Sequence, residues 1–391
     1  MTLTSRRRIL GQRTTNVRSG VACICCPIFG YLIDISPTRK LPYLLGLVLL
    51  GASMVLLALA NSLWMFISAR LIQGGATAMV IVAGLSLITD SVAVGNLGQM
   101  IGYLGSAVAI GFLLGPFLGG LVYDTAGYHA VFIVAFSIVG VDLVMRFAVI
   151  EKKVAQRWTK GLLDGRPSNG EYQTFPSEYH PPETSERGEF VLPLLARQPR
   201  ILISSWALLV QGIFYGAFDS TIPVFVGSRF NWTAFGAGLT FLPGALSAFF
   251  EPYFGYISDT YGNRLISFLG FALLSPTLIS LRFVSQNSTD RKILLFTLQG
   301  LIGLFMNLCL PALYVETQQV LDEMERARPG IFGRKGAIAQ GFSIQTLAQF
   351  LGLFFGPVAG GFIEYRFGWN AMVACLGVLA GVTAIPMLLL S

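Results

Sequence analysis

The stretch GFLLGPFLGG, from Gly111 to Gly120, places four glycines and one proline in a strongly apolar neighbourhood. Glycine and proline are poor helix residues in water, but in a bilayer neighbouring helices satisfy the hydrogen bond that a proline removes. Nearly the same string returns as GLFFGPVAGG, from Gly352 to Gly361. A pattern of this kind, present twice, predicts a membrane protein with two matched halves.

Both strings repeat glycine at every fourth position, which places the glycines on one face of a helix. The residues concerned are Gly111, Gly115, Pro116 and Gly119 in the first string and Gly352, Gly356, Pro357 and Gly360 in the second. Small residues at this spacing are typical of helices that approach each other closely. We therefore expect tight packing at both faces, beside a bend at each proline. The alternative is a hinge or a proton-tight seam in each half.

Composition also favours a membrane protein. Of the 391 residues, 54% are hydrophobic and 12% are charged, whereas soluble domains carry about 25% charged residues. The net charge of +7 is spread over loops between apolar blocks, which favours membrane topology over nucleic-acid binding. The five cysteines and two histidines have no metal-ligand spacing, so we expect no metal and no cofactor.

A helix needs about 20 apolar residues to cross a bilayer. One block, Val21–Ile33, is shorter, with only about thirteen residues. The longer blocks are Leu41–Ala60, Trp64–Ile88, Met100–Tyr123, Ala130–Ile150, Ile201–Phe225, Phe235–Ile257, Leu265–Phe283, Ile293–Val315, Ala337–Ile363 and Trp369–Leu390. Together they predict an all-α membrane protein with about 11 transmembrane helices.

Polar segments divide the chain into four parts. Residues 1–20 are rich in arginine and are expected to form an irregular basic N-terminus. Residues 21–150 are expected to form an N-terminal helical bundle, and residues 201–391 a C-terminal six-helix bundle. Residues 151–200 between them are polar and predict a cytosolic linker.

The side of the membrane follows from the basic residues. Lysine and arginine are concentrated in alternate loops, beginning with Arg39 and Lys40 and including the linker. Because cytosolic loops carry the excess of basic residues, these loops are assigned to the cytosol. Glycosylation sequons at Asn231 and Asn287 fall on the opposite side, whereas the N-terminal arginines disagree with the assignment.

A second motif is also present twice. GYLIDISPTRK at Gly30–Lys40 returns as GYISDTYGNR at Gly255–Arg264. In both copies an apolar helix ends in Gly-Tyr, and an aspartate and then a basic residue follow. Transporters are commonly built from repeats, with the substrate site between them.

These motifs resemble those of the major facilitator superfamily. Gly30, Asp34, Arg39 and Lys40 are similar to its cytosolic-loop signature, and the run Arg70–Gly74 to its fourth-helix motif. The loop match is partial, because Ile35 and Pro37 stand where the family usually has a basic residue and a glycine.

The stretch GFLLGPFLGG, from Gly111 to Gly120, carries the most specific part of the resemblance. Gly111, Gly115, Pro116, Gly119 and Gly120 match the fifth-helix motif of the drug:proton antiporter branch. The surrounding stretch is similar to fungal vesicular-amine-transporter-like members. The resemblance implies a two-bundle transporter of twelve helices, of which this chain lacks the first.

Polar and charged groups are costly inside a bilayer, so those within an apolar block or at its end are functional candidates. As substrate or proton-pathway residues we select Arg70, Gln73, Tyr215, Asp219, Glu251, Asn307 and Glu316. The resemblance implies that Arg70 partners a titrating carboxylate; the alternative is a helix-end arginine that reaches the headgroups. Because protonation removes the desolvation cost of a buried carboxylate, Asp219 is a candidate for proton coupling. A structural hydrogen bond is the alternative there.

For the two repeated loops, the resemblance implies a contact that locks one conformation. The gating residues would be Gly30, Asp34, Arg39 and Lys40 in the first loop and Gly255, Asp259 and Arg264 in the second. The alternative is ordinary helix-end charge.

The sequence contains no serine-hydrolase, zinc-protease or phosphate-binding motif, so we expect no enzyme. The resemblance implies a proton-coupled antiporter that exports small organic compounds such as drugs, amines or metabolites. The alternative is a truncated or non-transporting membrane protein that retains the fold. Expected partners are the lipid bilayer, protons and a small-molecule substrate, with no nucleic acid. We expect a monomer in the plasma membrane or in a vacuolar or vesicular membrane.

Overall fold

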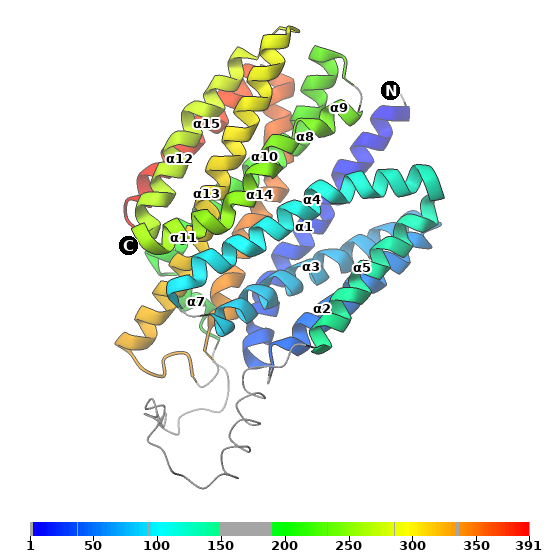
Figure 1. Cartoon of the computed structure of the whole chain (residues 1–391). Coiled ribbons are helices and arrows are strands. Elements are labelled where there is room, and N and C mark those ends of the chain that lie inside the picture. The colour runs from blue at the N-terminus through cyan, green and yellow to red at the C-terminus, as the bar shows by residue number, and fades with distance from the viewer. Residues whose placement is uncertain are drawn as a thin grey trace, which may run out of the picture.

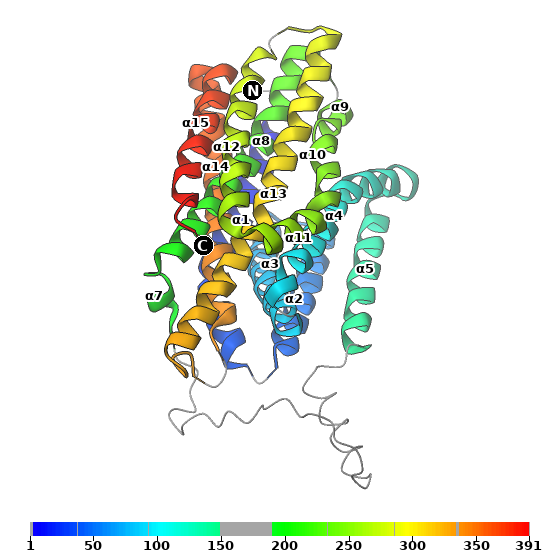
Figure 2. The same cartoon turned by 60° about the vertical axis from the view of Figure 1, so that its left-hand side comes forward.

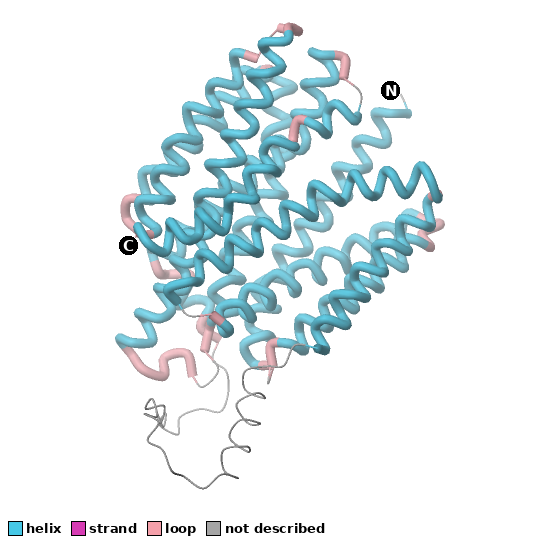
Figure 3. Tube along the Cα trace, in the orientation of Figure 1, coloured by secondary structure: helices cyan, strands magenta, loops and turns pink. Residues whose placement is uncertain are grey.

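The computed structural model describes residues 3–36, 38–92, 94–148, 190–232, 234–284, 286–333 and 336–390. All regular secondary structure in these residues is helical, and the helices form two bundles side by side (Figure 1 and Figure 3). Nine helices of the described part are long and apolar enough to cross a membrane, and α4 has a shorter apolar stretch. The prediction of an all-α membrane protein is confirmed.

The first bundle contains α1 (Leu3–Ile35), α2 (Lys40–Ala58), α3 (Leu63–Ser91), the short helix η1 (Val94–Asn96), α4 (Leu97–Ala126) and α5 (Tyr128–Ala148). The second contains α7 (Leu192–Leu195), α8 (Pro199–Phe230), α9 (Ala234–Leu239), α10 (Leu242–Ser247), η2 (Ala248–Phe250), α11 (Glu251–Tyr261), α12 (Asn263–Ser280), η3 (Leu281–Phe283), α13 (Thr289–Ala327), α14 (Ile338–Phe367) and α15 (Trp369–Met387).

Helix α1 is longer than the sequence indicated. It begins at Leu3, which corrects the prediction of an irregular N-terminus over residues 1–20. No proline occurs before Pro27, and arginine, leucine and glutamine are good helix formers, so the helix extends through the basic segment. Its apolar stretch, Arg18–Ile35, has 18 residues and is a candidate span. The short block Val21–Ile33 is therefore part of a longer apolar helix.

The block that was predicted as one helix over Phe235–Ile257 is interrupted. It forms α9, α10, η2 and α11. Pro243 and Pro252 lie in the first turns of α10 and α11. Proline has no N–H group, so it fits the first turn of a helix, where that group would have no partner, better than the helix interior. The interruption makes Glu251 the first residue of α11.

The predicted linker over residues 151–200 lies mostly outside the described residues, and only its last part is described, from Phe190 onward. This part contains α7 and the first residues of α8. Val191 and Leu195 are buried in a small apolar cluster with side chains of α8, α13 and α14. The chain that leads into the second bundle is therefore packed against it.

The two bundles meet along two helix pairs, α1 with α14 and α4 with α11; Figure 2 shows α4 alongside α11. In the first pair, a Cβ atom on Gly30 would lie 2.6 Å from the Cβ of Ser343. In the second pair, Gly255 lies against the backbone of Gly98. Gly30 and Gly255 are equivalent in the repeated motif, so the repeat makes the same close approach in each seam.

The glycine face of α14 packs as predicted. Gly352 lies against the backbone of α8, and a Cβ atom on Gly356 would lie 2.5 Å from the carbonyl oxygen of Ile213. A Cβ atom on Gly360 would lie 2.7 Å from the Cβ of Ala217. All three glycines therefore allow α14 to approach α8 closely, as small residues do between membrane helices.

The equivalent face of α4 differs, which corrects the packing prediction for the first string. A Cβ atom on Gly111, Gly115 or Gly119 would meet no described atom within 4 Å. The internal repeat relates α4 to α14, so the counterpart of α8 would come before α1, and the described residues contain no such helix. The surroundings of Pro116 and Gly120 lie outside what the structure describes.

Candidate functional site

The end of α1 closes against the start of α14 through Asp34. Its carboxylate accepts hydrogen bonds from the backbone N–H groups of Ala339, at 3.0 Å, and Gln340, at 2.9 Å. The first N–H groups of a helix have no partner within the helix and carry a partial positive charge. Asp34, which is 3% exposed, therefore caps a helix of the other bundle.

Arg39 supports Asp34 from within the first bundle. Its Nη2 lies 3.7 Å from the carboxylate of Asp34. Its Nη1 lies 2.8 Å from the carboxylate of Asp90 and donates to the carbonyl oxygen of Ser86 at 3.1 Å. Arg39 thereby ties the end of α1 to the end of α3. Lys40, the other basic residue of this loop, is the first residue of α2.

The second seam repeats the capping contact. Asp259, near the end of α11, accepts hydrogen bonds from the N–H groups of Gly98, at 3.0 Å, and Gln99, at 3.1 Å, at the start of α4. Arg264, the basic residue of this loop, lies in the first turn of α12. The two aspartates of the repeated motif thus cap helices of opposite bundles, while their role in gating stays a prediction.

Four of the predicted pathway residues lie together in the second bundle. The hydroxyl of Tyr215 on α8 lies 3.4 Å from the Oδ1 of Asn307 on α13. Asn307 in turn donates from Nδ2 to the hydroxyl of Ser247 at 3.0 Å. Asp219 and Glu251 are both close enough to Tyr215 to act on it electrostatically. The cluster therefore combines two carboxylates with a phenol and an amide.

Within this cluster the two carboxylates have different surroundings. Asp219 is exposed, and Tyr215 one turn before it is 39% exposed, so this face of α8 is open. Glu251 is only 3% exposed, and its Oε2 has no hydrogen-bond partner among the described residues. It faces Gly105 of α4 so closely that a side chain on Gly105 would occupy the place of the carboxylate. Glu251 therefore lies in the seam between the bundles.

Arg70 and Gln73 are paired with each other in the first bundle. Arg70 donates from Nη1 to the Oε1 of Gln73 at 2.7 Å, and its guanidinium lies 5.2 Å from the ring centre of Phe66. Its Nε is buried without a hydrogen-bond partner among the described residues. The titrating carboxylate that the resemblance implied is not beside Arg70 in the described part of the chain.

The charged neighbour of Arg70 is a second arginine. Arg18 on α1 lies close enough to Arg70 to repel it electrostatically, where Gly74 allows α3 to approach the backbone of Arg18. The chain contains no aspartate or glutamate before Asp34, so α1 offers no carboxylate at this depth. Two like charges therefore lie together, Arg18 at the start of one candidate membrane span and Arg70 within another.

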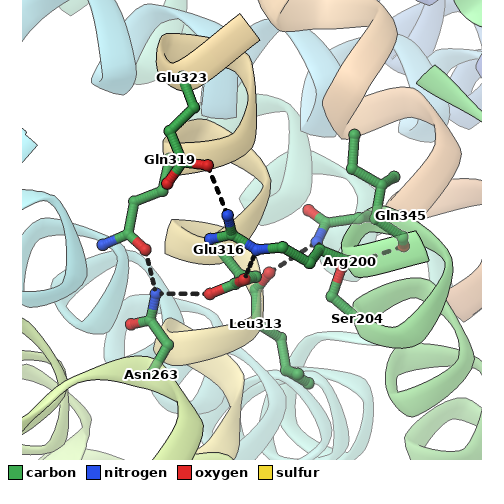
Figure 4. A network of polar contacts seen from close by, with 9 residues as sticks. Arg200, Ser204, Asn263, Leu313, Glu316, Gln319, Glu323 and Gln345 are labelled. Carbon is green, nitrogen blue, oxygen red and sulfur yellow. Dashed lines mark hydrogen bonds and ion pairs between the residues drawn. The ribbon is translucent and has the colours of Figure 1, made fainter. Parts of the chain in front are cut away.

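Glu316 stands apart from the Tyr215 cluster, in a network that Figure 4 shows. Its side chain is fully buried and accepts from the Nε of Arg200 at 2.6 Å and from the Nδ2 of Asn263 at 3.1 Å. Arg200 also pairs with Glu323, at 2.6 Å, and Asn263 donates to Gln319 at 2.9 Å. The network joins α8, α12 and α13, so Glu316 braces the second bundle internally.

Sequence reasoning missed Arg200, Asn263 and Gln340. Arg200 was counted with the polar linker, although it is the second residue of α8. Asn263 and Gln340 lie at the starts of α12 and α14, and no local pattern separates Asn263 from ordinary loop residues. A signal was available for Gln340, because Gln99 has the same place at the start of α4.

Comparison with known proteins shows the family of this chain. Residues 16–329 match the family described as Major Facilitator Superfamily. The MFS-type transporter ppzB of Metarhizium rileyi is 30% identical over 382 residues, which cover 88% of this chain and 78% of that protein. The uncharacterized MFS-type transporter C18.02 of Schizosaccharomyces pombe is 31% identical over 360 residues, with 90% and 79% covered.

More distant relatives extend the comparison. Multidrug resistance protein MdtG of Yersinia enterocolitica is 24% identical, over 95% of this chain and 82% of that protein. The crystal structure of the human organic anion transporter MFSD10 (TETRAN) superposes with a TM-score of 0.69 at 18% identity. That superposition covers 97% of this chain and 84% of the human one. The chain belongs to the major facilitator superfamily of membrane transporters.

Proposed function

We propose that the protein is a proton-coupled antiporter that exports small organic compounds by alternating access between its two bundles. The observation that carries this proposal is the pair of capping contacts, Asp34 on α14 and Asp259 on α4. Both lie at the same end of the molecule as the basic loops assigned to the cytosol. Two equivalent contacts between repeated bundles are what a reversible closure at that end needs.

The strength of these contacts supports a closure that can open again. A carboxylate at a helix N-terminus contributes about 0.3 to 2 kcal/mol, depending on burial. Two such contacts, one in each seam, are strong enough to favour a closed end. They are also weak enough for substrate or proton binding to shift the balance, because a few kcal/mol separates the states of a switching protein.

Proton coupling rests on the carboxylates of the Tyr215 cluster. Taking a carboxylate out of water is costly, and protonation removes that cost. Asp219 is exposed on α8, and we propose that it exchanges a proton with water when the bundles open there. Glu251 lies in the seam between α4 and α11, where its protonation state bears directly on how closely the bundles can approach.

The substrate class is proposed by similarity alone. Two of the similar proteins, MdtG and the human MFSD10, are named for multidrug resistance and for organic anion transport. For this chain we propose small organic compounds such as drugs, amines or metabolites, moved against protons.

Asp219→Asn is expected to abolish transport that a pH gradient drives. The substitution keeps the shape of the side chain but removes the group that can release a proton. The purified protein would be reconstituted in liposomes that contain a pH-sensitive dye, and a panel of organic cations and anions would be added under an imposed pH gradient. Compound-dependent proton flux in the wild type, and none in Asp219→Asn, is the expected result.

The matched control is Asp290→Asn, which changes an exposed aspartate at the start of α13 and should leave the flux intact. Unchanged flux in Asp219→Asn would remove Asp219 from the mechanism. No flux with any compound would favour the rival, a membrane protein that keeps the fold without the transport cycle. The open glycine face of α4 is the observation that favours this rival.

A further inference from the structure

The first described residues of the linker touch both bundles. We define the strap as Phe190–Leu195, which includes α7. At one end, the ring of Phe190 meets the ring of Tyr31 on α1 edge-on, with 5.5 Å between ring centres. At the other end, Val191 and Leu195 are buried against α8, α13 and α14. The strap therefore crosses the seam between α1 and α14 next to the Asp34 contact.

Gln340 joins the strap to that contact. Its Oε1 accepts hydrogen bonds from the backbone N–H groups of Val191, at 3.0 Å, and Leu192, at 3.1 Å. Its own backbone N–H donates to Asp34 at 2.9 Å, and its side-chain amide also hydrogen-bonds to Asp34. Gln340 is 1% exposed, so water does not compete for these groups.

The orientation of the Gln340 amide follows from its partners. Backbone N–H groups only donate, so the amide oxygen must face Val191 and Leu192. A carboxylate only accepts, so the amide nitrogen must face Asp34. One planar group therefore holds the strap on one side and the aspartate on the other, and a rotation that releases one of them releases both.

The second seam provides an internal comparison. Gln99 occupies the same place at the start of α4 as Gln340 does at the start of α14, and its backbone N–H donates to Asp259 in the same way. The Gln99 side chain holds no equivalent of the strap among the described residues. The two closures thus share the capping contact, and only the first adds a connection to the chain that leaves the linker.

We infer that Gln340 couples the strap to the Asp34 contact, so that the strap must detach before α1 and α14 separate. In this role Gln340 is a positioning residue for the contact between α1 and α14. The end of the linker then controls the seam between α1 and α14 but not the seam between α4 and α11. The inference rests on the proposed alternating access of the bundles. It predicts that the strap keeps the first seam closed for longer than the capping contact alone would.

The test measures how often the first seam opens. Ser343, fully buried against Gly30, would be changed to Cys in a background whose five native cysteines are replaced by alanine. A membrane-impermeant maleimide added to inside-out vesicles then reacts with this cysteine only when α1 and α14 separate. The variants are Gln340→Met, which keeps the volume but loses both amide contacts, and Gln99→Met as its matched control.

Gln340→Met is expected to raise the labelling rate at least about threefold, because it removes buried hydrogen bonds on both sides of the amide. Gln99→Met should leave the rate unchanged. Phe190→Ala serves as a second variant, since its side chain is 55% exposed and its loss does not threaten folding; it should also raise the rate. Equal rates in all variants, or an equal rise in Gln340→Met and Gln99→Met, would overturn the inference.

The two proposals fail separately. Labelling reports the opening of the seam and needs no substrate, so a rise in Gln340→Met can occur even if no compound evokes proton flux. Proton flux can depend on Asp219 while the labelling rate is the same in Gln340→Met and Phe190→Ala as in the wild type. That result would overturn the role of the strap and support the proposed antiport.

Discussion

Arg200 shows how burial decides what a single polar contact contributes. It pairs with two carboxylates at the same distance of 2.6 Å, and one of them, on Glu316, is fully buried while the other, on Glu323, is 57% exposed. Exposed ion pairs contribute about 0 to 1 kcal/mol. Removing one partner of a buried pair costs about 3 to 5 kcal/mol, because the other charge loses its compensation.

Glu316→Ala is therefore expected to destabilise the protein by about 3 kcal/mol, since Arg200 and Asn263 both lose a buried acceptor. Glu323→Ala, the control with the same partner and distance, should cost less than about 1 kcal/mol. Thermal unfolding of the purified protein in detergent measures both. Equal shifts in the two variants would contradict the assignment of Glu316 as an internal brace.

The role of Glu316 was also the point at which residue-level prediction was least informative. Its position directly after the apolar block Ile293–Val315 marked it as a functional candidate, but its partner Arg200 lies 116 positions earlier in the chain. No local pattern connects the two, because their contact depends on how α8 and α13 pack. Asp34 and Asp259 were easier to select, since a repeated motif carries both.

At the scale of the helix, α14 and α4 share a sequence pattern but not an environment. The glycine face of α14 is covered by α8, whereas that of α4 meets no described atom. The pattern predicted close approach at both faces, and among the described residues this is confirmed for α14 and not for α4. The other helices of the bundle decide which helix covers each face, and the spacing of the glycines alone does not specify that helix.

Gly356→Ala is expected to destabilise the protein by about 1 to 3 kcal/mol, because the new methyl group would meet the backbone of α8. Gly115→Ala should be neutral or stabilise by up to about 1 kcal/mol, since alanine is the better helix former and nothing described lies nearby. Melting temperatures of the two purified variants decide the matter. A loss in Gly115→Ala as large as that in Gly356→Ala would mean that another helix covers this face.

Helix boundaries also depend partly on local sequence and partly on how the helices pack. The positions of most helices follow from apolar length, but the interruption between α9 and α11 depends on Pro243 and Pro252. Those prolines were visible in the sequence, yet prolines also lie inside α8 and α14 without ending them. Neighbouring helices decide whether a proline bends a membrane helix or divides it.

At the scale of the whole molecule, the two closures are unequal. Asp34 has Arg39 and the Gln340 side chain beside it in addition to two backbone N–H groups. The hydrogen bonds of Asp259 come from backbone N–H groups alone among the described contacts. The repeat predicted two like contacts, and the structure adds that Asp34 has more partners than Asp259.

Asp34→Asn should accordingly open the cytosolic end more than Asp259→Asn does. Spin labels at Leu41→Cys and Leu265→Cys, both exposed positions in opposite bundles, would report the separation as a distance distribution. We expect a larger population of long distances in Asp34→Asn, because it weakens a contact that involves four groups. The reverse order, or equal populations, would contradict the inequality.

Arg18 and Arg70 have a consequence for the energetics of transport. Both lie within candidate membrane spans, and the described residues place no carboxylate beside either. A charge that crosses a membrane potential of 100 mV changes in energy by about 2.3 kcal/mol. If the first bundle tilts during the cycle, these two charges move through part of that field together. Membrane voltage, as well as the pH gradient, would then bias which side of the protein is open.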